Sequence, residues 1–514
     1  MSTQSPVLLS ACAVCATITF SLLLRWSRKR RGSALPLPPG PPRLPIVGNM
    51  FQMPEKNVWE TALEWGKTYG DMLYLEVAGF PMMIINSNEV ATDLLTKRSS
   101  IYSSRPQMVM PVIGGWGWAT PMLPYGETHK WHRSILHKFF ASPNLLKYTE
   151  SQQQGCYMFL RHMLESPQDY DRHVRRLPTV VMMMNTYGHS VKDDNDRYVV
   201  QGEKCARTVT DFFGYFVLDL MPWLRHVPEW FPGANFQRLA RESRELSKSY
   251  RHDLYALTKK NFNEGTAKEC LTTLYLESAT NSEGVVEDEE LFGDVTSIVF
   301  LAGSDTSVTG IMNLVLALLK FPEAQRRAQE ELDRVVGTDR LPTFDDRGRL
   351  PYVNALCSEV LRWQIVGPIA LPHYTTEEDE YRGFRIPKGT IVLPNLWAMG
   401  RNADIYPDPL EFKPERWLPG GVNYDSVRPE DFVFGYGRRI CPGKNWAETM
   451  LFITAATLVS AFNLEQAVDA DGKPIPLNEE YEGESIRYLG KSECKITPRS
   501  EKIAALISEY AESF

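Results

Sequence analysis

The chain has 514 residues, of which 43% are hydrophobic and 11% aromatic, so it carries enough apolar side chain for a large folded core. This composition excludes a disordered or fibrous protein. The formal net charge of −7 argues against binding nucleic acid through a basic surface. Eight cysteines are too few and too irregularly spaced for a disulfide-stapled scaffold.

An uncharged segment near the N-terminus, from Val7 to Leu24, is long enough to cross a bilayer. Five cations follow within residues 25–31, and the positive-inside rule places them, with the rest of the chain, on the cytosolic side. A cleaved signal peptide would carry its positive charge before the apolar run. We therefore favour an uncleaved membrane anchor and basic stop at residues 1–31, followed by a stiff proline-rich hinge at residues 32–45.

The next part of the chain predicts a helix followed by a β-hairpin. Residues 59–69 have helical spacing, and residues 72–77 and 82–86 read as strands around a glycine-containing turn. Further short strands are expected near residues 379–393, but most of the remaining periodic segments are helical. Since nothing resembles a second linker, we expect one large domain over residues 46–514.

The longest helical pattern covers residues 291–320, which would span about 45 Å. Its middle is apolar on nearly every side, so the helix should be buried, whereas the polar stretch 261–290 before it reads as a surface connection. Within this buried helix, residues 302–307 (Ala-Gly-Ser-Asp-Thr-Ser) combine small residues with an acid and hydroxyls, against local preference. Such a break often marks a functional site, although a kink packed against a neighbour would also explain it.

The strongest chemical signal is the glycine-rich loop Phe434–Gly443, which presents Cys441 just before a helix expected from Asn445. Backbone N–H groups of the turn and of the helix N-terminus can stabilise a thiolate. Arg439 can meet an anionic group on the same ligand. At this point an ordinary turn that buries a structural cysteine remains the alternative. Three glycines permit positive φ and close backbone approach to a flat ligand: Gly435, Gly437 and Gly443.

A charged pair upstream supports a functional role for this loop. Glu359 and Arg362 lie one helical turn apart, so they share a face. Arg416, in the segment Pro414–Trp417, can complete a Glu–Arg–Arg network.

In their order along the chain, these motifs resemble those of the cytochrome P450 family. Residues 434–443 match the family pattern Phe-x-x-Gly-x-Arg-x-Cys-x-Gly, and residues 302–307 resemble its oxygen-activating helix motif. The resemblance covers residues 36 to about 500 and implies a mainly α fold with small β-sheets, preceded by one N-terminal transmembrane helix. It further implies a single-pass protein of the endoplasmic reticulum membrane, with the catalytic domain facing the cytosol.

The resemblance implies a haem-thiolate monooxygenase with haem b as cofactor and Cys441 as the protein ligand to the iron. Thr306 and Asp305 would form the proton-delivery pair for O2, and the small Gly303 and Ser304 would leave room for it. Electrons would come from NADPH through NADPH–cytochrome P450 reductase. The other loop positions that would contact the haem are Phe434, Gly437 and Gly443.

Propionate partners are implied by the same resemblance, with one departure from the family pattern. Arg439, His373 and Arg133 occupy positions where the family places cationic or hydrogen-bonding partners. The usual Trp-x-x-x-Arg becomes His129-x-x-x-Arg133, and Trp131 follows two residues after His129. Either His129 donates the hydrogen bond in place of the tryptophan, or the helix is rotated and Trp131 packs there. We favour His129 because an imidazole N–H can replace an indole N–H.

Substrate and partners can be expected only by class. Segments such as Ile101-Tyr102-Ser103 resemble fungal members, many of which hydroxylate secondary metabolites: terpenoids first, then aromatic polyketides or indoles. We expect a small hydrophobic substrate, and a loop tip at residues 221–232 that dips into membrane lipid. Five cations would steer an acidic reductase, with a merely solvated basic face as the alternative: Lys130, Arg133, Lys138, Arg438 and Lys444.

Two other classes of function fit the motifs less well. A non-catalytic haem-binding or sensor protein would not need Asp305 and Thr306. A haem-thiolate isomerase or dehydratase uses no O2, and such enzymes often alter the oxygen-helix motif, which is intact here apart from Ser307 in place of the commoner threonine.

Overall fold

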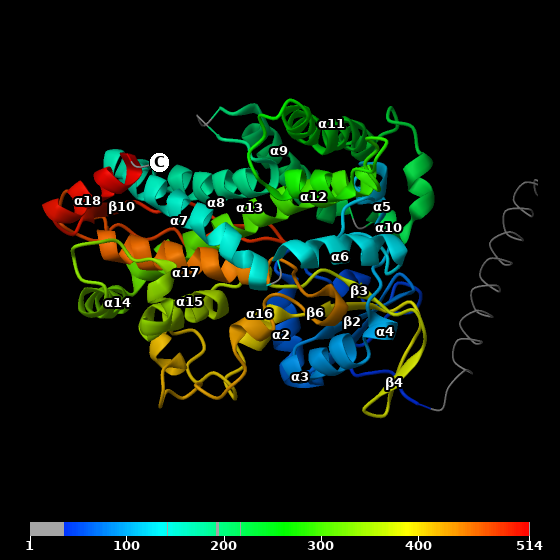
Figure 1. Ribbon diagram of the computed structural model, residues 1–514. Coiled ribbons are helices and arrows are strands. Elements are labelled where there is room, and N and C mark those ends of the chain that lie inside the picture. Colours follow the sequence, from blue (N-terminus) through cyan, green and yellow to red (C-terminus); the bar gives the residue numbers. More distant parts are fainter. Residues whose placement is uncertain (1–34, 141, 192–194, 216, 513–514) are drawn as a thin grey trace, which may run out of the picture.

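Helix α13 (Glu289–Lys320) runs through the middle of the molecule, and the other long helices pack around it (Figure 1). The computed structural model describes residues 35–140, 142–191, 195–215 and 217–512. The expected membrane anchor lies outside these residues. Within them, α13 is the one helix long and apolar enough to cross a membrane, and its middle is buried in the domain. The expectation of a buried helix at residues 291–320 is confirmed.

The fold is mainly helical with small sheets, as expected. The described helices are α2 (Val58–Tyr69), α3 (Asn88–Ala91), α4 (Ser99–Tyr102), α5 (Val109–Ile113), α6 (Glu127–Phe140), α7 (Ser142–Glu165), α8 (Tyr170–Tyr187), α9 (Arg197–Asp211), α10 (Val217–Leu220), α11 (Asn235–Asn263), α12 (Leu271–Ala279), α13, α14 (Pro322–Val335), α15 (Pro351–Trp363), α16 (Leu396–Gly400), α17 (Lys444–Ala461) and α18 (Glu501–Glu512). The strands are β1 (Met72–Val77), β2 (Phe80–Ile85), β3 (His373–Tyr374), β4 (Asp379–Tyr381), β5 (Phe384–Ile386), β6 (Ile391–Pro394), β7 (Phe462–Gln466), β8 (Tyr481–Glu482), β9 (Tyr488–Leu489) and β10 (Cys494–Pro498).

The largest sheet has four strands in the order β1-β2-β6-β3 and lies with α2 and α3 at one end of the molecule (Figure 1). The expected hairpin forms between β1 and β2, with Ala78 and Gly79 as a two-residue turn at positive φ. Strand β2 pairs parallel with β6, which joins residues about 300 positions apart. The proline-rich segment is fastened to this end, because the Pro39 carbonyl accepts a 2.8 Å hydrogen bond from the backbone N–H of Tyr74.

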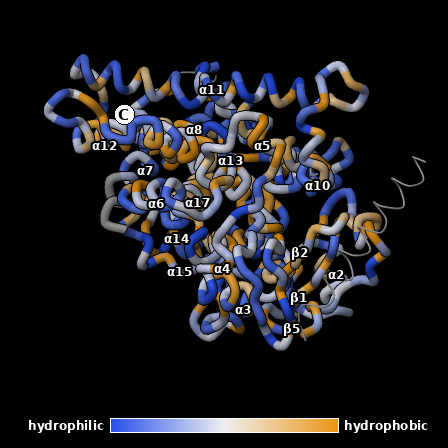
Figure 2. The backbone as a smooth tube through the Cα atoms, turned by 90° about the vertical axis from the view of Figure 1, so that its right-hand side faces the viewer, coloured by the Kyte–Doolittle hydropathy of each residue, from blue (hydrophilic) through white to orange (hydrophobic). Residues whose placement is uncertain are grey.

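One expectation about the surface was wrong. The polar stretch 261–290 contains α12, whose residues Leu271 and Leu276 are buried. The ring of Tyr275, in the same helix, stacks on Phe292 of α13 at 3.7 Å between centroids. The apolar positions of α12 occupy only nine residues between polar flanks, too short a run to show a helical period. Figure 2 shows that α11, along the upper edge, is mainly hydrophilic, whereas the segments inside the molecule are more hydrophobic.

Candidate active site

The loop around Cys441 is held by backbone contacts. The Cys441 N–H donates a 2.7 Å hydrogen bond to the Phe434 carbonyl, and helix α17 begins at Lys444, one residue before the expected start. Gly437 has φ +53°, and a Cβ there would lie 2.2 Å from the carbonyl oxygen of Leu95. Glycine is therefore required at Gly437 both by its backbone angle and by the close approach of a second segment.

Gly443 differs from the expectation of positive φ. Its φ is −85°, an angle open to any residue. Its role is at the sulfur instead, because the Gly443 N–H donates a hydrogen bond to Cys441 and lowers the thiol pKa. Gly435, at φ +78°, does meet the expectation.

Cys441 is set apart from the other cysteines by its surroundings. Among the cysteines that the structure describes, only Cys441 is exposed. Protein nevertheless surrounds the side chain closely, and this burial raises the thiol pKa against the opposing effects of Gly443 and Arg133. The thiol is thus placed to bind a ligand rather than to fill a core.

The oxygen-helix motif presents a different residue to open space than expected. Ala302 is exposed and Thr306 is half-buried, although the segments before and after them in α13 are buried. These two residues lie four apart and share a helix face. Gly303 packs against α8 instead, since a Cβ there would lie 2.3 Å from Cε of Met182. Ser304 is buried and donates to the carbonyl of Phe300 at 2.9 Å. Ala302, not Gly303 or Ser304, therefore keeps this face open.

The expected proton-delivery pair sits at the same turn of α13. Thr306 Oγ1 donates a 2.7 Å hydrogen bond to the Ala302 carbonyl. The Asp305 carboxylate accepts a 2.5 Å hydrogen bond from the hydroxyl of Tyr488 on β9. Burial raises the pKa of Asp305, and the Tyr488 bond counteracts part of that rise. Tyr488 is 183 residues away in the chain, and no motif pointed to it.

The expected propionate partners gather beside the cysteine loop. Arg133 on α6 donates to the Ile440 carbonyl at 2.8 Å, and Arg439 donates to the Ser103 and Leu123 carbonyls, each at 2.7 Å. Burial lowers the pKa of Arg439 to about 10, with a further contribution from the charge of Arg133. His373 is buried, and its Nδ1 lies 2.8 Å from the Tyr102 carbonyl.

Arg105 joins this cluster and was missed from the sequence. It is 8% exposed and donates to the carbonyls of Leu371 and Pro372, each at 2.8 Å. Burial lowers its pKa to about 9, and the neighbouring charge of Arg439 lowers it further. A lone arginine after two serines carries no sequence signal that separates it from an exposed one.

Helix α6 places His129, rather than Trp131, beside these arginines. His129 is 3% exposed, and burial together with the charges of Arg439 and Arg133 lowers its pKa to about 3. Trp131 points elsewhere, with its ring edge-on to Tyr275 at 6.4 Å. The geometry favours the first of the two alternatives that the sequence left open.

This cluster fits a ligand that carries negative charge. Arg105, Arg133 and Arg439 form no ion pair with a carboxylate of the described residues, although buried charges are normally compensated. Two buried nitrogens, His129 Nδ1 and Arg439 Nη1, have no hydrogen-bond partner among the described residues. Open positions at Cys441 and Ala302, together with these cations, match what a haem with two propionates requires.

The Glu–Arg–Arg network forms as expected. Arg362 donates to both carboxylate oxygens of Glu359, at 2.7 and 3.0 Å, and both side chains are fully buried. Arg416 and Trp417 donate to the same carboxylate at 3.2 and 2.9 Å. The network ties α15 to the segment that leads into the cysteine loop.

Comparison with known proteins gives a consistent result. The model of the family described as Cytochrome P450 matches residues 38–481. The chain is 41% identical to cytochrome P450 monooxygenase COX2 of Coprinopsis cinerea, over 98% of this chain and 96% of the relative. It is 36% identical to COX1 of the same fungus, with 99% of each covered, and 37% identical to cytochrome P450 monooxygenase ple1 of Rhodocybe pseudopiperita, with 94% of each covered.

Proposed function

The chain belongs to the cytochrome P450 family and is a monooxygenase of that family, and from this premise we propose that it inserts one oxygen atom of O2 into a C–H bond of a small hydrophobic fungal secondary metabolite. The observation that carries the proposal is a chain that has both an exposed thiol at Cys441 and, on an otherwise buried central helix, an exposed Ala302 next to the half-buried Thr306. We therefore prefer a monooxygenase to the two other functions considered, a haem-binding sensor protein and a haem-thiolate isomerase or dehydratase.

Family membership implies a haem-thiolate cofactor, and the residues present fit one. Cys441 would hold its iron through the thiolate, and Phe434, Gly437 and Gly443 of the same loop would contact it. Arg133, Arg439, His129 and His373, joined by Arg105, would bind the propionates. Bound there, the haem would supply the reductive activation of O2 and the transfer of oxygen to carbon.

The remaining chemistry falls to side chains of α13. Ala302 leaves space on this face of α13, and Thr306 on the same face holds a proton on Oγ1. For Thr306 to donate it toward the oxygen substrate, its hydroxyl must leave the Ala302 carbonyl. Asp305 would then supply a new proton to Thr306, because burial raises the pKa of Asp305 toward the range in which a carboxyl group can carry a proton.

The proposed substrate class rests on the resemblance to fungal members of the family. Val299 lies on the same face of α13 as Ala302 and Thr306 and is apolar, whereas Ile365 after α15 packs into a hydrophobic core cluster. We keep the order expected from the resemblance: a terpenoid first, then an aromatic polyketide or an indole. Microsomes with NADPH, reductase and isotopically labelled O2 should convert a member of these classes to a product that carries one labelled oxygen. NADPH oxidation without labelled product across the panel would contradict the substrate class.

The electron donor is proposed to be NADPH–cytochrome P450 reductase, docked by exposed cations. Lys130 and Arg438 both lie over the ring of Tyr125, at 5.7 and 5.1 Å, so α6 and the cysteine loop contribute to one basic surface. Lys138 is exposed on α6, whereas Arg133 is turned toward the Ile440 carbonyl and is left out of the proposed docking surface. Charge reversal of Lys130 and Arg438 should slow reductase-driven turnover most at low salt. Lys502→Glu, on α18, serves as the control.

We also propose that the protein is attached to the endoplasmic reticulum membrane. Exposed aromatic residues concentrate after α10, where Trp223 is 63% and Trp230 80% exposed. Near the start of the described chain, Ile46 is 77% exposed. Tryptophan is favoured at membrane interfaces, so these tips suit contact with lipid beside the anchor expected from the sequence. Carbonate-resistant membrane association of the full chain, lost on deletion of residues 1–31, would test the anchor.

A further inference from the structure

Asp305 is held from outside the oxygen-helix motif, on a flank of α13 next to the one that carries Thr306. Successive helix residues are turned by about 100°, so Asp305 faces a different direction from Thr306. Its carboxylate accepts the 2.5 Å hydrogen bond from Tyr488, the first residue of β9. A second tyrosine of the same β8–β9 hairpin, Tyr481, donates to Asn313 of α13 at 2.9 Å. The hairpin is therefore joined to α13 at two points.

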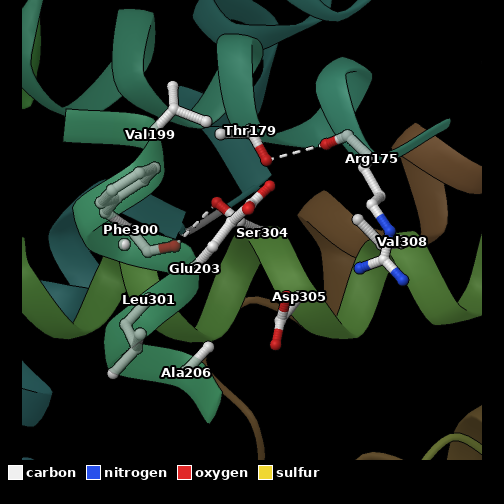
Figure 3. Close-up of a pocket in the computed structure, with 11 residues that line it drawn as sticks. Arg175, Thr179, Val199, Glu203, Ala206, Phe300, Leu301, Ser304, Asp305 and Val308 are labelled. Carbon is white, nitrogen blue, oxygen red and sulfur yellow. Dashed lines mark hydrogen bonds between the residues drawn. The ribbon is translucent and has the colours of Figure 1, made fainter. Parts of the chain in front are cut away.

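A small cavity opens beside Asp305, between α8, α9 and α13 (Figure 3). The volume within it that is open to the centre of a water molecule is about 20 Å³, which is enough for one water. Its polar lining includes Arg175 and Thr179 of α8, Glu203 of α9 and Ser304 of α13. This cavity lies on a different flank of α13 from Ala302 and Thr306, so Asp305 stands between the two.

We propose that Tyr488 is a positioning residue for proton delivery: its hydroxyl holds the Asp305 carboxyl at this cavity, where the carboxyl takes up a proton from water before passing it to Thr306. The proton passes to Asp305 from a water in the cavity, and that water regains a proton from bulk solvent, so no hydroxide remains. The proton leaves when Asp305 donates to Oγ1 of Thr306 while the Thr306 hydroxyl proton moves to the oxygen substrate. The Asp305 carboxylate then returns to Tyr488. This inference rests on the proton-delivery role proposed above for Asp305.

The charges around Asp305 make the effect of Tyr488 measurable. Arg175 of α8 and Arg207 of α9 lower the pKa of Asp305, and so does the Tyr488 hydrogen bond. Glu203 of α9 lines the same cavity, and Asp305 in turn raises the pKa of Tyr250 on α11. Loss of the Tyr488 hydroxyl removes one stabilising bond from the carboxylate and leaves the charged neighbours in place. The pKa of Asp305 should then rise by about one unit, the size of one hydrogen bond to a charged group.

Tyr488→Phe keeps the ring and removes only the hydroxyl, and Tyr481→Phe is the matched control on the same hairpin. In the resting full-length holoenzyme, the infrared band of protonated Asp305, isolated by subtracting the spectrum of the matching Asp305→Asn variant, should persist to higher pH in Tyr488→Phe. In reductase-coupled NADPH oxidation, the alkaline limb of the pH profile should move up by about the same amount. Tyr481→Phe should leave both the infrared titration of Asp305 and the alkaline limb of the pH profile as they are in the wild type.

Two results would overturn this role of Tyr488, and they are distinguishable. In the first, Tyr488→Phe leaves the infrared titration and the alkaline limb of the pH profile unchanged, while Asp305→Asn flattens that limb. This result would exclude the positioning role of Tyr488 and leave Asp305 as the proton carrier. An unchanged limb in Asp305→Asn would remove the proton-delivery role of Asp305 itself.

Discussion

The Nε atom of Arg416 lies 3.2 Å from a carboxylate oxygen of Glu359, so a carboxylate on α15 is joined to the segment before the cysteine loop. The same carboxylate binds Arg362, and all three side chains are buried. Two buried cations thus depend on one anion. This arrangement makes the cysteine loop sensitive to a residue that does not touch it.

Glu359→Gln should destabilise the protein strongly, because it leaves Arg362 and Arg416 buried without their anion. Loss of one partner of a buried pair costs about 3–5 kcal/mol. The free energy of unfolding in urea measures this cost. Glu323→Gln, which breaks an exposed cluster with Arg326 and Arg327, is the control and should change little. Equal effects of the two substitutions would contradict a structural role for Glu359.

His129 should be replaceable by a residue that keeps a ring N–H. If its unpartnered Nδ1 donates to a propionate, His129→Trp will retain haem and His129→Phe will lose it faster, by about tenfold for one hydrogen bond to a charged group. Transfer of haem to excess apomyoglobin measures this rate. Equal rates for the two variants would show that packing, not hydrogen bonding, matters at this position.

The burial of His132 should make the folded protein less stable in acid. Its Nδ1 lies 2.9 Å from the Thr120 hydroxyl, and burial lowers its pKa to about 4 from the ordinary 6.5. The unfolded chain therefore binds a proton at a higher pH than the folded chain does. The contribution of His132 is present above pH 6.5 and is lost as the pH falls toward 4, at about 1.4 kcal/mol per pH unit.

Urea unfolding of the holoenzyme between pH 7 and 5 tests this slope. His132→Gln should make the fall in stability shallower, whereas His226→Gln, at an exposed position, should leave it unchanged. A wild-type slope in His132→Gln would mean that other groups control the acid response.

Ala302 and Gly303 should respond in opposite ways to the same added side chain. Ala302→Val places methyl groups in the open space, so it should slow CO association with the reduced protein and leave stability nearly unchanged. Gly303→Val drives a side chain into Met182 of α8 and should cost about 1–3 kcal/mol through overpacking. Flash photolysis and urea unfolding separate the two effects. A slower CO association in Gly303→Val alone would contradict the orientation of α13.

Motif spacing identified the cysteine loop, the oxygen-helix segment and the Glu359–Arg362 pair, because each depends on local geometry. The face that α13 presents could not be predicted in this way. It depends on Gly303 packing against Met182, a contact between separate helices. Arg105 and Tyr488 were missed for the same reason, since only the folded chain brings them to the site.

The central claim is that the Cys441 thiolate holds a haem, and the difference spectrum of the reduced, CO-bound protein tests it most directly. The wild type should show the red-shifted band of a thiolate-ligated haem, and Cys441→Ala should lose it. Cys357→Ala, at a buried cysteine of α15, should keep it. The same red-shifted band in Cys441→Ala would contradict the account.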